Sequence, residues 1–198
     1  MIGVFGGTFD PPHLGHLILA DEGRAALGLS QVVWTIAGDP PHKPDEGLTP
    51  VGRRIEMVRA ALSADPHFNL SLMDVDRPGP HYTVDGLDRL RNENGDQPIA
   101  YLMGSDSLRD LPAWYQPDRF VELVDRIGIL RRPGVSFDLA ALDRQLPGLA
   151  GKVVFFDAPL VEIAGRDIRD RVRQGRPYRY FVLPAVADLI DRHSLYLS

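Results

Sequence analysis

Cysteine is absent from the 198 residues of this chain. Its absence excludes disulfides, thiolate metal sites and cysteine nucleophiles. Long apolar runs are missing as well, because no stretch approaches the roughly 20 residues that a membrane-spanning helix needs. The first residues, MIGVFGG, have neither the basic nor the extended apolar region of a secretory signal. We therefore expect a cytoplasmic protein with no membrane partner.

The chain also lacks an excess of positive charge. It carries 22 Lys and Arg against 27 Asp and Glu, a net charge of -5. Proteins that bind nucleic acids usually present a basic face, so we expect no nucleic-acid partner. The net charge does not exclude binding of a small anionic ligand, because local arginines and lysines decide such binding. The hydrophobic content of 44% is typical of a soluble globular protein.

Short apolar runs alternate with amphipathic stretches along most of the chain. The runs predict strands at 2–5, 31–38, 68–76, 98–104, 126–134 and 152–159. The stretches between them predict helices, among them 13–28, 49–64 and 83–94. Gly28 ends the first of these and Gly95 the third, while Thr49 is the N-cap of the second. This alternation predicts an α/β fold with a doubly wound, Rossmann-like parallel sheet.

The last part of the chain has a different pattern. It predicts two helices with no strand between them, and therefore a small C-terminal helical cap on the sheet. No repeat, low-complexity tract or linker divides the sequence. We expect a single domain, residues 1–198, with a core of about residues 1–160 and a helical subdomain of about residues 161–198.

The densest cluster of chemistry-bearing residues is GGTFDPPHLGH, residues 6–16. Paired glycines at the end of a strand let the backbone turn closely past a ligand. The N-terminus of the helix that follows favours a phosphate. His13 and His16 are three residues apart and share one helical face, where the helix N-terminus lowers an imidazole pKa and leaves a neutral donor. The string is neither G-x-G-x-x-G nor a P-loop.

GGTFDPPHLGH resembles the T/H-x-G-H signature of the nucleotidyltransferase superfamily. Further motifs follow in the order seen in the bacterial nicotinate-nucleotide adenylyltransferase family, and the resemblance covers nearly the whole chain: PPHK (40–43), HYTVDGL (81–87), GSDSL (104–108), WYQPDRF (114–120) and RPG (132–134). It implies transfer of the adenylyl group of ATP to nicotinate mononucleotide, giving deamido-NAD and pyrophosphate in NAD biosynthesis. It also implies Mg²⁺ as cofactor, held by phosphates and water rather than by dedicated protein ligands.

The resemblance also assigns roles to individual residues. His16, His13 and Lys43 would be catalytic, the histidines at the α-phosphate and the lysine at the triphosphate. ATP would further contact Gly7, Thr8, Phe9, Gly104, Asp106, Arg132, Arg166, Ile168 and Arg169. Nicotinate mononucleotide would contact Tyr82, Thr83 and Trp114, with the indole stacked on the pyridine ring. The reaction would be a direct in-line attack, so alignment and charge stabilisation would carry the catalysis.

The resemblance breaks at one motif. The family pattern I-S-S-T-x-I-R is written here as IAGRDIR, residues 163–169, so three hydroxyl donors are missing. Arg166 adds a forked, charged donor that either replaces them or occupies the site when ATP is absent. Two alternatives therefore stay open: a nucleotidyltransferase with another acceptor, such as nicotinamide mononucleotide or phosphopantetheine, and a non-catalytic nucleotide-binding relative. The oligomeric state also stays open, and a homo-oligomer is one of the alternatives.

Overall fold

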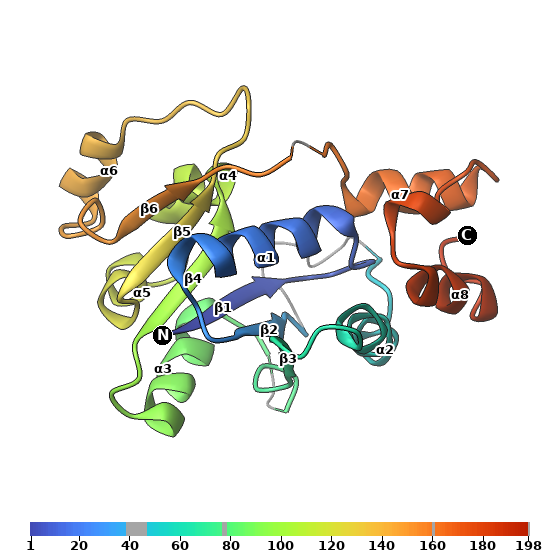
Figure 1. The fold of residues 1–198 in the computed structure, drawn as a ribbon, viewed down its shortest axis with the longest axis horizontal. Coiled ribbons are helices and arrows are strands. Elements are labelled where there is room, and N and C mark those ends of the chain that lie inside the picture. The colour runs from blue at the N-terminus through green and yellow to red at the C-terminus, as the bar shows by residue number, and fades with distance from the viewer. Residues whose placement is uncertain (39–46, 77–78, 160, 198) are drawn as a thin grey trace.

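The computed structural model describes residues 1–38, 47–76, 79–159 and 161–197. Its centre is a parallel sheet of six strands: β1 (Ile2–Gly7), β2 (Val32–Ile36), β3 (Phe68–Ser71), β4 (Ile99–Gly104), β5 (Arg126–Leu130) and β6 (Val153–Phe156). The strands lie in the order β3-β2-β1-β4-β5-β6 (Figure 1). This confirms the predicted fold class. Because the winding direction reverses between β1 and β4, a ligand crevice is expected at the carboxyl ends of these two strands.

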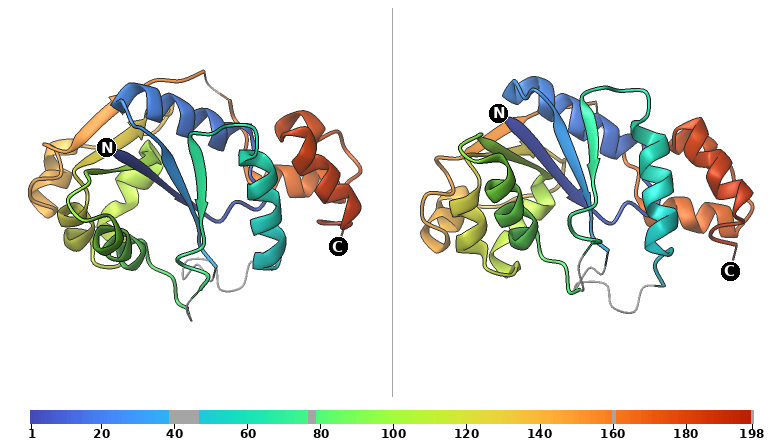
Figure 2. Two further views of the ribbon diagram at one scale, coloured as in Figure 1. Left: turned by 60° about the horizontal axis from the view of Figure 1, so that its bottom comes forward. Right: turned by 90° about the horizontal axis from the view of Figure 1, so that it is seen from below.

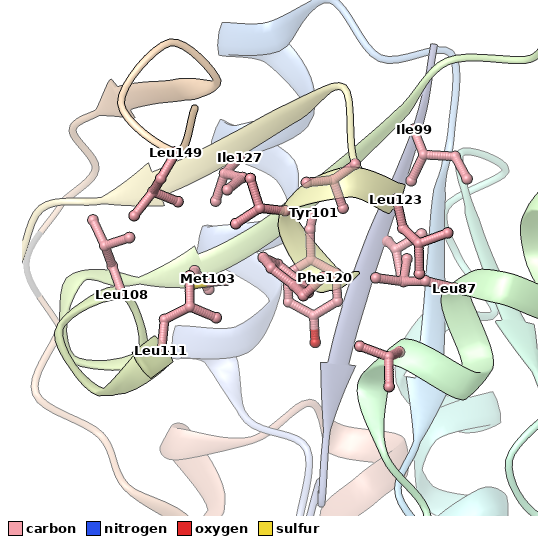
Figure 3. Close-up of a cluster of buried hydrophobic side chains, with 14 of the residues drawn as sticks. Leu87, Ile99, Tyr101, Met103, Leu108, Leu111, Phe120, Leu123, Ile127 and Leu149 are labelled. Carbon is pink, nitrogen blue, oxygen red and sulfur yellow. The ribbon is translucent and has the colours of Figure 1, made fainter. Parts of the chain in front are cut away.

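Helices cover both faces of the sheet. Helices α1 (Leu14–Leu27) and α2 (Val51–Leu62) pack on one face, against a core that contains Trp34. The other face carries α3 (Thr83–Asn94), α4 (Ser105–Asp110), α5 (Pro117–Leu123) and α6 (Leu139–Gln145), with the 3₁₀ turn η1 (Leu111–Ala113) after α4. Figure 3 shows the core on this face, where Tyr101 lies among aliphatic side chains with its hydroxyl directed away from them.

The residues after the sheet form a helical unit that packs against α2. It consists of α7 (Gly165–Arg173), the 3₁₀ turn η2 (Arg179–Phe181) and α8 (Pro184–Arg192). Ile168, Val186 and Ile190 of this unit bury their side chains together with Met57 of α2. Figure 2 shows α7 and α8 beside α2, at the side of the molecule away from β6. Among the described residues, no helix is long and apolar enough to cross a membrane.

Most element boundaries follow the sequence pattern, and the exceptions have local causes. Gly28 ends α1 in the left-handed conformation, with φ +62°, as its place after the apolar run predicts. The predicted N-cap of α2 was wrong, because Pro50 holds that position. Thr49 is instead fixed through its backbone, its N–H donating to Asp10 and its carbonyl accepting from Arg54. The third strand stops at Ser71, and residues 73–76 form turns.

Candidate functional site

The β1–α1 turn, residues 6–13, stands at the switch point of the sheet. Gly6 and Gly7 are close-packed against side chains. A Cβ on Gly6 would come within 2.5 Å of the Tyr101 hydroxyl, and one on Gly7 within 2.8 Å of the Phe9 ring. Phe9 takes the left-handed conformation, with φ +50°, while its ring is buried 4.9 Å from that of Trp34. Phe9 can therefore offer a ligand its backbone, but not its ring.

His13 and His16 lie at the start of α1. His13 is the N-cap, so the helix begins one residue later than the sequence predicts. The two imidazoles are stacked, with ring centroids 3.6 Å apart. The backbone N–H of His13 donates to Nδ1 of His16 over 3.2 Å. Because Nδ1 accepts this bond, the hydrogen of the neutral His16 ring lies on Nε2, which becomes a donor.

Both histidines are neutral at neutral pH. Burial, together with the positive charge of Arg132, lowers the pKa of His13 from 6.5 to about 4. Burial first, then His13 and Arg132, brings the pKa of His16 well below its ordinary value. The predicted direction of the shift is thus confirmed, and burial is its largest cause, followed by nearby positive charge. The pair offers hydrogen-bond donors without a permanent charge.

A first cavity, the α1–α7 cleft, runs between the N-terminal ends of these two helices and has a volume of about 600 Å³. It is lined by Thr8, Phe9, Asp10, Pro11, His13, His16, Leu48, Ala164, Gly165, Arg166 and Arg169. Two helix N-termini, two neutral imidazole donors and two arginines meet here, which is a suitable environment for a chain of phosphates. Arg166 extends into solvent with 80% of its side chain exposed, 4.0 Å from the Asp167 carboxylate.

A second cavity, the β1–α3 cavity, opens on the other side of the β1–α1 turn and has a volume of about 220 Å³. Its walls include Thr35, Met73, Asp74, His81, Tyr82, Thr83, Tyr101, Trp114 and Tyr115. The Trp114 indole packs edge-on against Tyr101 and Phe120. Tyr82 and Tyr115 stack on each other with centroids 4.1 Å apart. These aromatic walls suit a flat heterocycle.

The two cavities adjoin, because Thr8 lines both. A nucleotide phosphate in one and a second nucleotide in the other would therefore meet at the end of β1. This is the geometry that an attack of one phosphate on another requires.

Three predicted residues lie beside the cavities at the same edge of the sheet. Gly104 ends β4, and Asp106 follows it in the first turn of α4. Arg132, just after β5, approaches Asp106 to 3.4 Å and lowers the pKa of both histidines. Ser105 supports this arrangement, since its hydroxyl accepts the N–H of Arg132 over 3.1 Å. The sequence thus brings these residues toward the histidine pair.

Two of the predicted ATP contacts stand apart from the others. Ile168 buries its side chain in the core between α2, α7 and α8, so this side chain anchors α7 and does not line the α1–α7 cleft. Lys43 lies outside the described residues. Arg169, by contrast, lines the cleft and donates to the carbonyl oxygen of Asp10 over 2.8 Å.

Sequence reasoning missed several residues of the site. His81 is buried and lines the β1–α3 cavity. Arg54 is buried and lies behind the β1–α1 turn, and Tyr196 reaches Asp10 from beyond α8. Tyr101 lines the cavity from β4, and burial raises its pKa to about 12. Local patterns could not reveal these contacts, because each partner is distant in sequence; only Tyr115 had a signal, its position beside Trp114.

Comparisons with known proteins show the family to which this chain belongs. The family model described as cytidylyltransferase-like matches residues 4–171. A protein of Thermomicrobium roseum, named as a probable nicotinate-nucleotide adenylyltransferase, is 47% identical over 195 residues, covering 98% of this chain and 91% of the relative. A protein of Roseiflexus sp. with the same name is 40% identical, covering 98% and 97%.

A solved structure from Plasmodium falciparum, a nicotinic acid mononucleotide adenylyltransferase complexed with NaAD, superposes with a TM-score of 0.79. It is 18% identical and covers 98% of this chain and 96% of that chain, so it supports the fold. The relatives with 47% and 40% identity show the family as well as the fold. The chain belongs to the cytidylyltransferase-like family and, within it, to the nicotinate-nucleotide adenylyltransferases.

Proposed function

We propose that this chain transfers the adenylyl group of ATP to nicotinate mononucleotide and releases deamido-NAD and pyrophosphate, a step of NAD biosynthesis. The observation that carries the proposal is the junction of two unlike cavities at Thr8. One is lined by phosphate-binding groups and the other by aromatic rings. Its relatives and structural neighbours are named for this reaction.

In this proposal the triphosphate of ATP occupies the α1–α7 cleft. His13 and His16 donate hydrogen bonds to the α-phosphate, where negative charge builds up as the acceptor attacks. Neutral donors fit this task, since their hydrogen bonds strengthen with the developing charge without holding the ground state too tightly. Arg166 and Arg169 contact the outer phosphates from α7, and Lys43 binds the triphosphate as well. Mg²⁺ enters bound to ATP, because it prefers phosphate oxygens and water.

The mononucleotide occupies the β1–α3 cavity. The pyridine ring stacks on Trp114, while its carboxylate accepts from backbone N–H groups where α3 begins, at Tyr82 and Thr83. Its phosphate then lies near Thr8, in line with the α-phosphate. Gly104, Asp106 and Arg132 contact the ribose and phosphate of the adenosine half. No covalent enzyme intermediate is needed, so the site supplies alignment and charge stabilisation.

In this proposal the chain acts as one domain, because the ATP cleft is built by the β1–α1 turn together with α7 of the helical unit. We also place the reaction in the cytoplasm.

The proposal is tested by initial-rate kinetics with MgATP and three acceptors: nicotinate mononucleotide, nicotinamide mononucleotide and phosphopantetheine. We expect the first to be preferred in kcat/KM, because backbone N–H groups at a helix N-terminus favour a carboxylate over an amide. His16→Ala, the control, should lower turnover by about 100-fold or more, as the loss of a transition-state donor does.

Each other outcome changes the assignment in a definite way. A preference for nicotinamide mononucleotide would keep the reaction but replace the acceptor. A preference for phosphopantetheine would overturn the assignment. ATP binding without pyrophosphate release above the His16→Ala level would identify a non-catalytic nucleotide-binding protein.

A further inference from the structure

Asp10 is a buried carboxylate in the wall of a cleft suited to anions. Only 5% of the residue is exposed, although it lines the α1–α7 cleft. Each of its carboxylate oxygens accepts a hydrogen bond: Oδ2 from the N–H of Thr49 over 3.1 Å, and Oδ1 from the hydroxyl of Tyr196 over 2.6 Å. Burial of a carboxylate is tolerated only when such donors are present.

The backbone of Asp10 is held as firmly as its side chain. Its carbonyl oxygen accepts from Arg169 over 2.8 Å, and Gly165 packs so closely that a Cβ there would lie 2.8 Å from the same oxygen. Asp10 thus joins the β1–α1 turn to the N-terminal end of α7. These two elements are the opposite walls of the α1–α7 cleft.

Arg54 completes the support of the turn from within α2. It is only 1% exposed, and its guanidinium donates to the carbonyl oxygens of Thr8, Ala37, Gly38 and Thr49 over 2.8–2.9 Å. Burial lowers the pKa of Arg54, and the neighbouring Asp10 opposes that effect. The β1–α1 turn, the end of β2 and the segment before α2 therefore share one buried hydrogen-bond network.

Tyr196 is the member of this network that comes from the far end of the chain. It takes the left-handed conformation, with φ +66°, which is uncommon for a residue with a large side chain. Its hydroxyl is directed to Oδ1 of Asp10 and also lies 3.9 Å from Sδ of Met57. Strain of this kind persists where surrounding contacts fix the residue in place.

We infer that Tyr196 is a positioning residue for the ATP site: through Oδ1 of Asp10 it fixes the β1–α1 turn against α7, so that the two walls of the cleft keep the spacing a triphosphate needs. The inference rests on the proposed function only in taking ATP as the ligand of that cleft. Tyr196 itself does not line the cleft, so it acts entirely through Asp10.

The test is Tyr196→Phe, which removes the hydroxyl and keeps the ring. Tyr178→Phe is the matched control, because Tyr178 belongs to the same helical unit and donates its hydroxyl to Asp191, away from the cleft. Affinity for ATP is measured by titration calorimetry without an acceptor, and KM values are measured for both substrates. We expect Tyr196→Phe to weaken ATP binding and raise the ATP KM about 5- to 20-fold, which is at or below the effect of one lost hydrogen bond to a charged group because the effect reaches ATP only through Asp10. The KM for the mononucleotide and both constants of Tyr178→Phe should stay within 2-fold of wild type.

A second variant keeps the inference testable if Tyr196→Phe does not fold. Asp10→Asn keeps one acceptor oxygen for the Thr49 N–H and offers an amide N–H to the Tyr196 hydroxyl, so both contacts lose the strength that the carboxylate charge gives them. If Asp10 acted only as a negative charge, its neutralisation would strengthen ATP binding. Positioning predicts the opposite, a weaker affinity for ATP. Stronger ATP binding by Asp10→Asn therefore overturns the inference.

The remaining outcomes separate this inference from the proposed function. If Tyr196→Phe binds ATP like Tyr178→Phe and differs only in melting temperature, Tyr196 is merely structural and the inference is wrong. If wild type forms no dinucleotide but its ATP binding is weakened by Tyr196→Phe alone, the proposed reaction is wrong and the positioning role stands.

Discussion

Arg166 is the residue at which this chain departs most visibly from its family's motif. It lines the α1–α7 cleft, and its only ion pair among the described residues is a 4.0 Å approach to the adjacent Asp167. An exposed pair at this distance contributes little to stability. The guanidinium is therefore free to bind a phosphate when one is present, as a replacement for the hydroxyl groups that the motif has lost.

This leads to a prediction for Arg166→Ala. The ATP KM should rise about 3- to 10-fold, which corresponds to about 0.7–1.4 kcal/mol, while the KM of the mononucleotide is unchanged. Arg173→Ala is the control, because Arg173 lies on the same helix and pairs with Asp170 instead of lining the cleft. Initial-rate kinetics provide the measurement. Equal ATP KM values in the two variants would mean that Arg166 only faces solvent.

At the scale of elements, helix α7 forms one wall of the α1–α7 cleft because it begins with a glycine, which lets it pack closely against Asp10. Alanine normally stabilises a helix relative to glycine by up to about 1 kcal/mol. At Gly165 the added methyl would lie 2.8 Å from the carbonyl oxygen of Asp10. Neither backbone can yield easily, since Arg169 and Tyr196 hold Asp10 in place. The close contact between α7 and the β1–α1 turn therefore outweighs the higher helix propensity of alanine at this position.

Gly165→Ala should therefore have the unusual sign for a substitution in a helix. We expect it to lower the free energy of unfolding by about 1–3 kcal/mol, as overpacking does, and to raise the ATP KM. Gly52→Ala, in α2, is the control, because nothing lies within 4 Å of its added Cβ. That variant should be unchanged or more stable by up to about 1 kcal/mol. Urea denaturation measures the free energy of unfolding of both variants. Stabilisation by Gly165→Ala would contradict the close packing of Gly165 against Asp10.

At the scale of the whole molecule, periodicity was enough to predict the doubly wound sheet, because each strand and helix buries its own apolar residues. The strand ends likewise placed Gly104 and Arg132 at one edge. The network around Asp10 was not predictable, since it joins residues as distant as Asp10 and Tyr196. Nor did spacing alone show that Phe9 would turn its ring into the core. Local patterns determine elements, whereas tertiary contacts determine how the elements support the site.

The buried histidine pair makes global stability depend on pH. The pKa of His13 falls from 6.5 in the unfolded chain to about 4 in the folded one. Between these values the unfolded state binds more protons, so the stability present above pH 6.5 is lost as the pH falls toward 4. From pH 7 to pH 5, His13 alone should lower the free energy of unfolding by about 2 kcal/mol. The pKa of His16 is lowered as well, so its contribution has the same sign.

Urea denaturation at pH 7, 6 and 5 tests this, with His13→Gln as the comparison and His67→Gln as the control. His67 is half-exposed, and its side chain contacts Asp65 far from the histidine pair. Replacing His13 removes one of the groups that must stay unprotonated, so its variant should lose about 2 kcal/mol less than wild type between pH 7 and pH 5. The His67→Gln variant should follow the wild-type pH dependence closely. If the His13→Gln and wild-type curves were parallel, His13 would be free to take up a proton in the folded state, and the neutral donor that we propose at the α-phosphate would be lost below about pH 6.5.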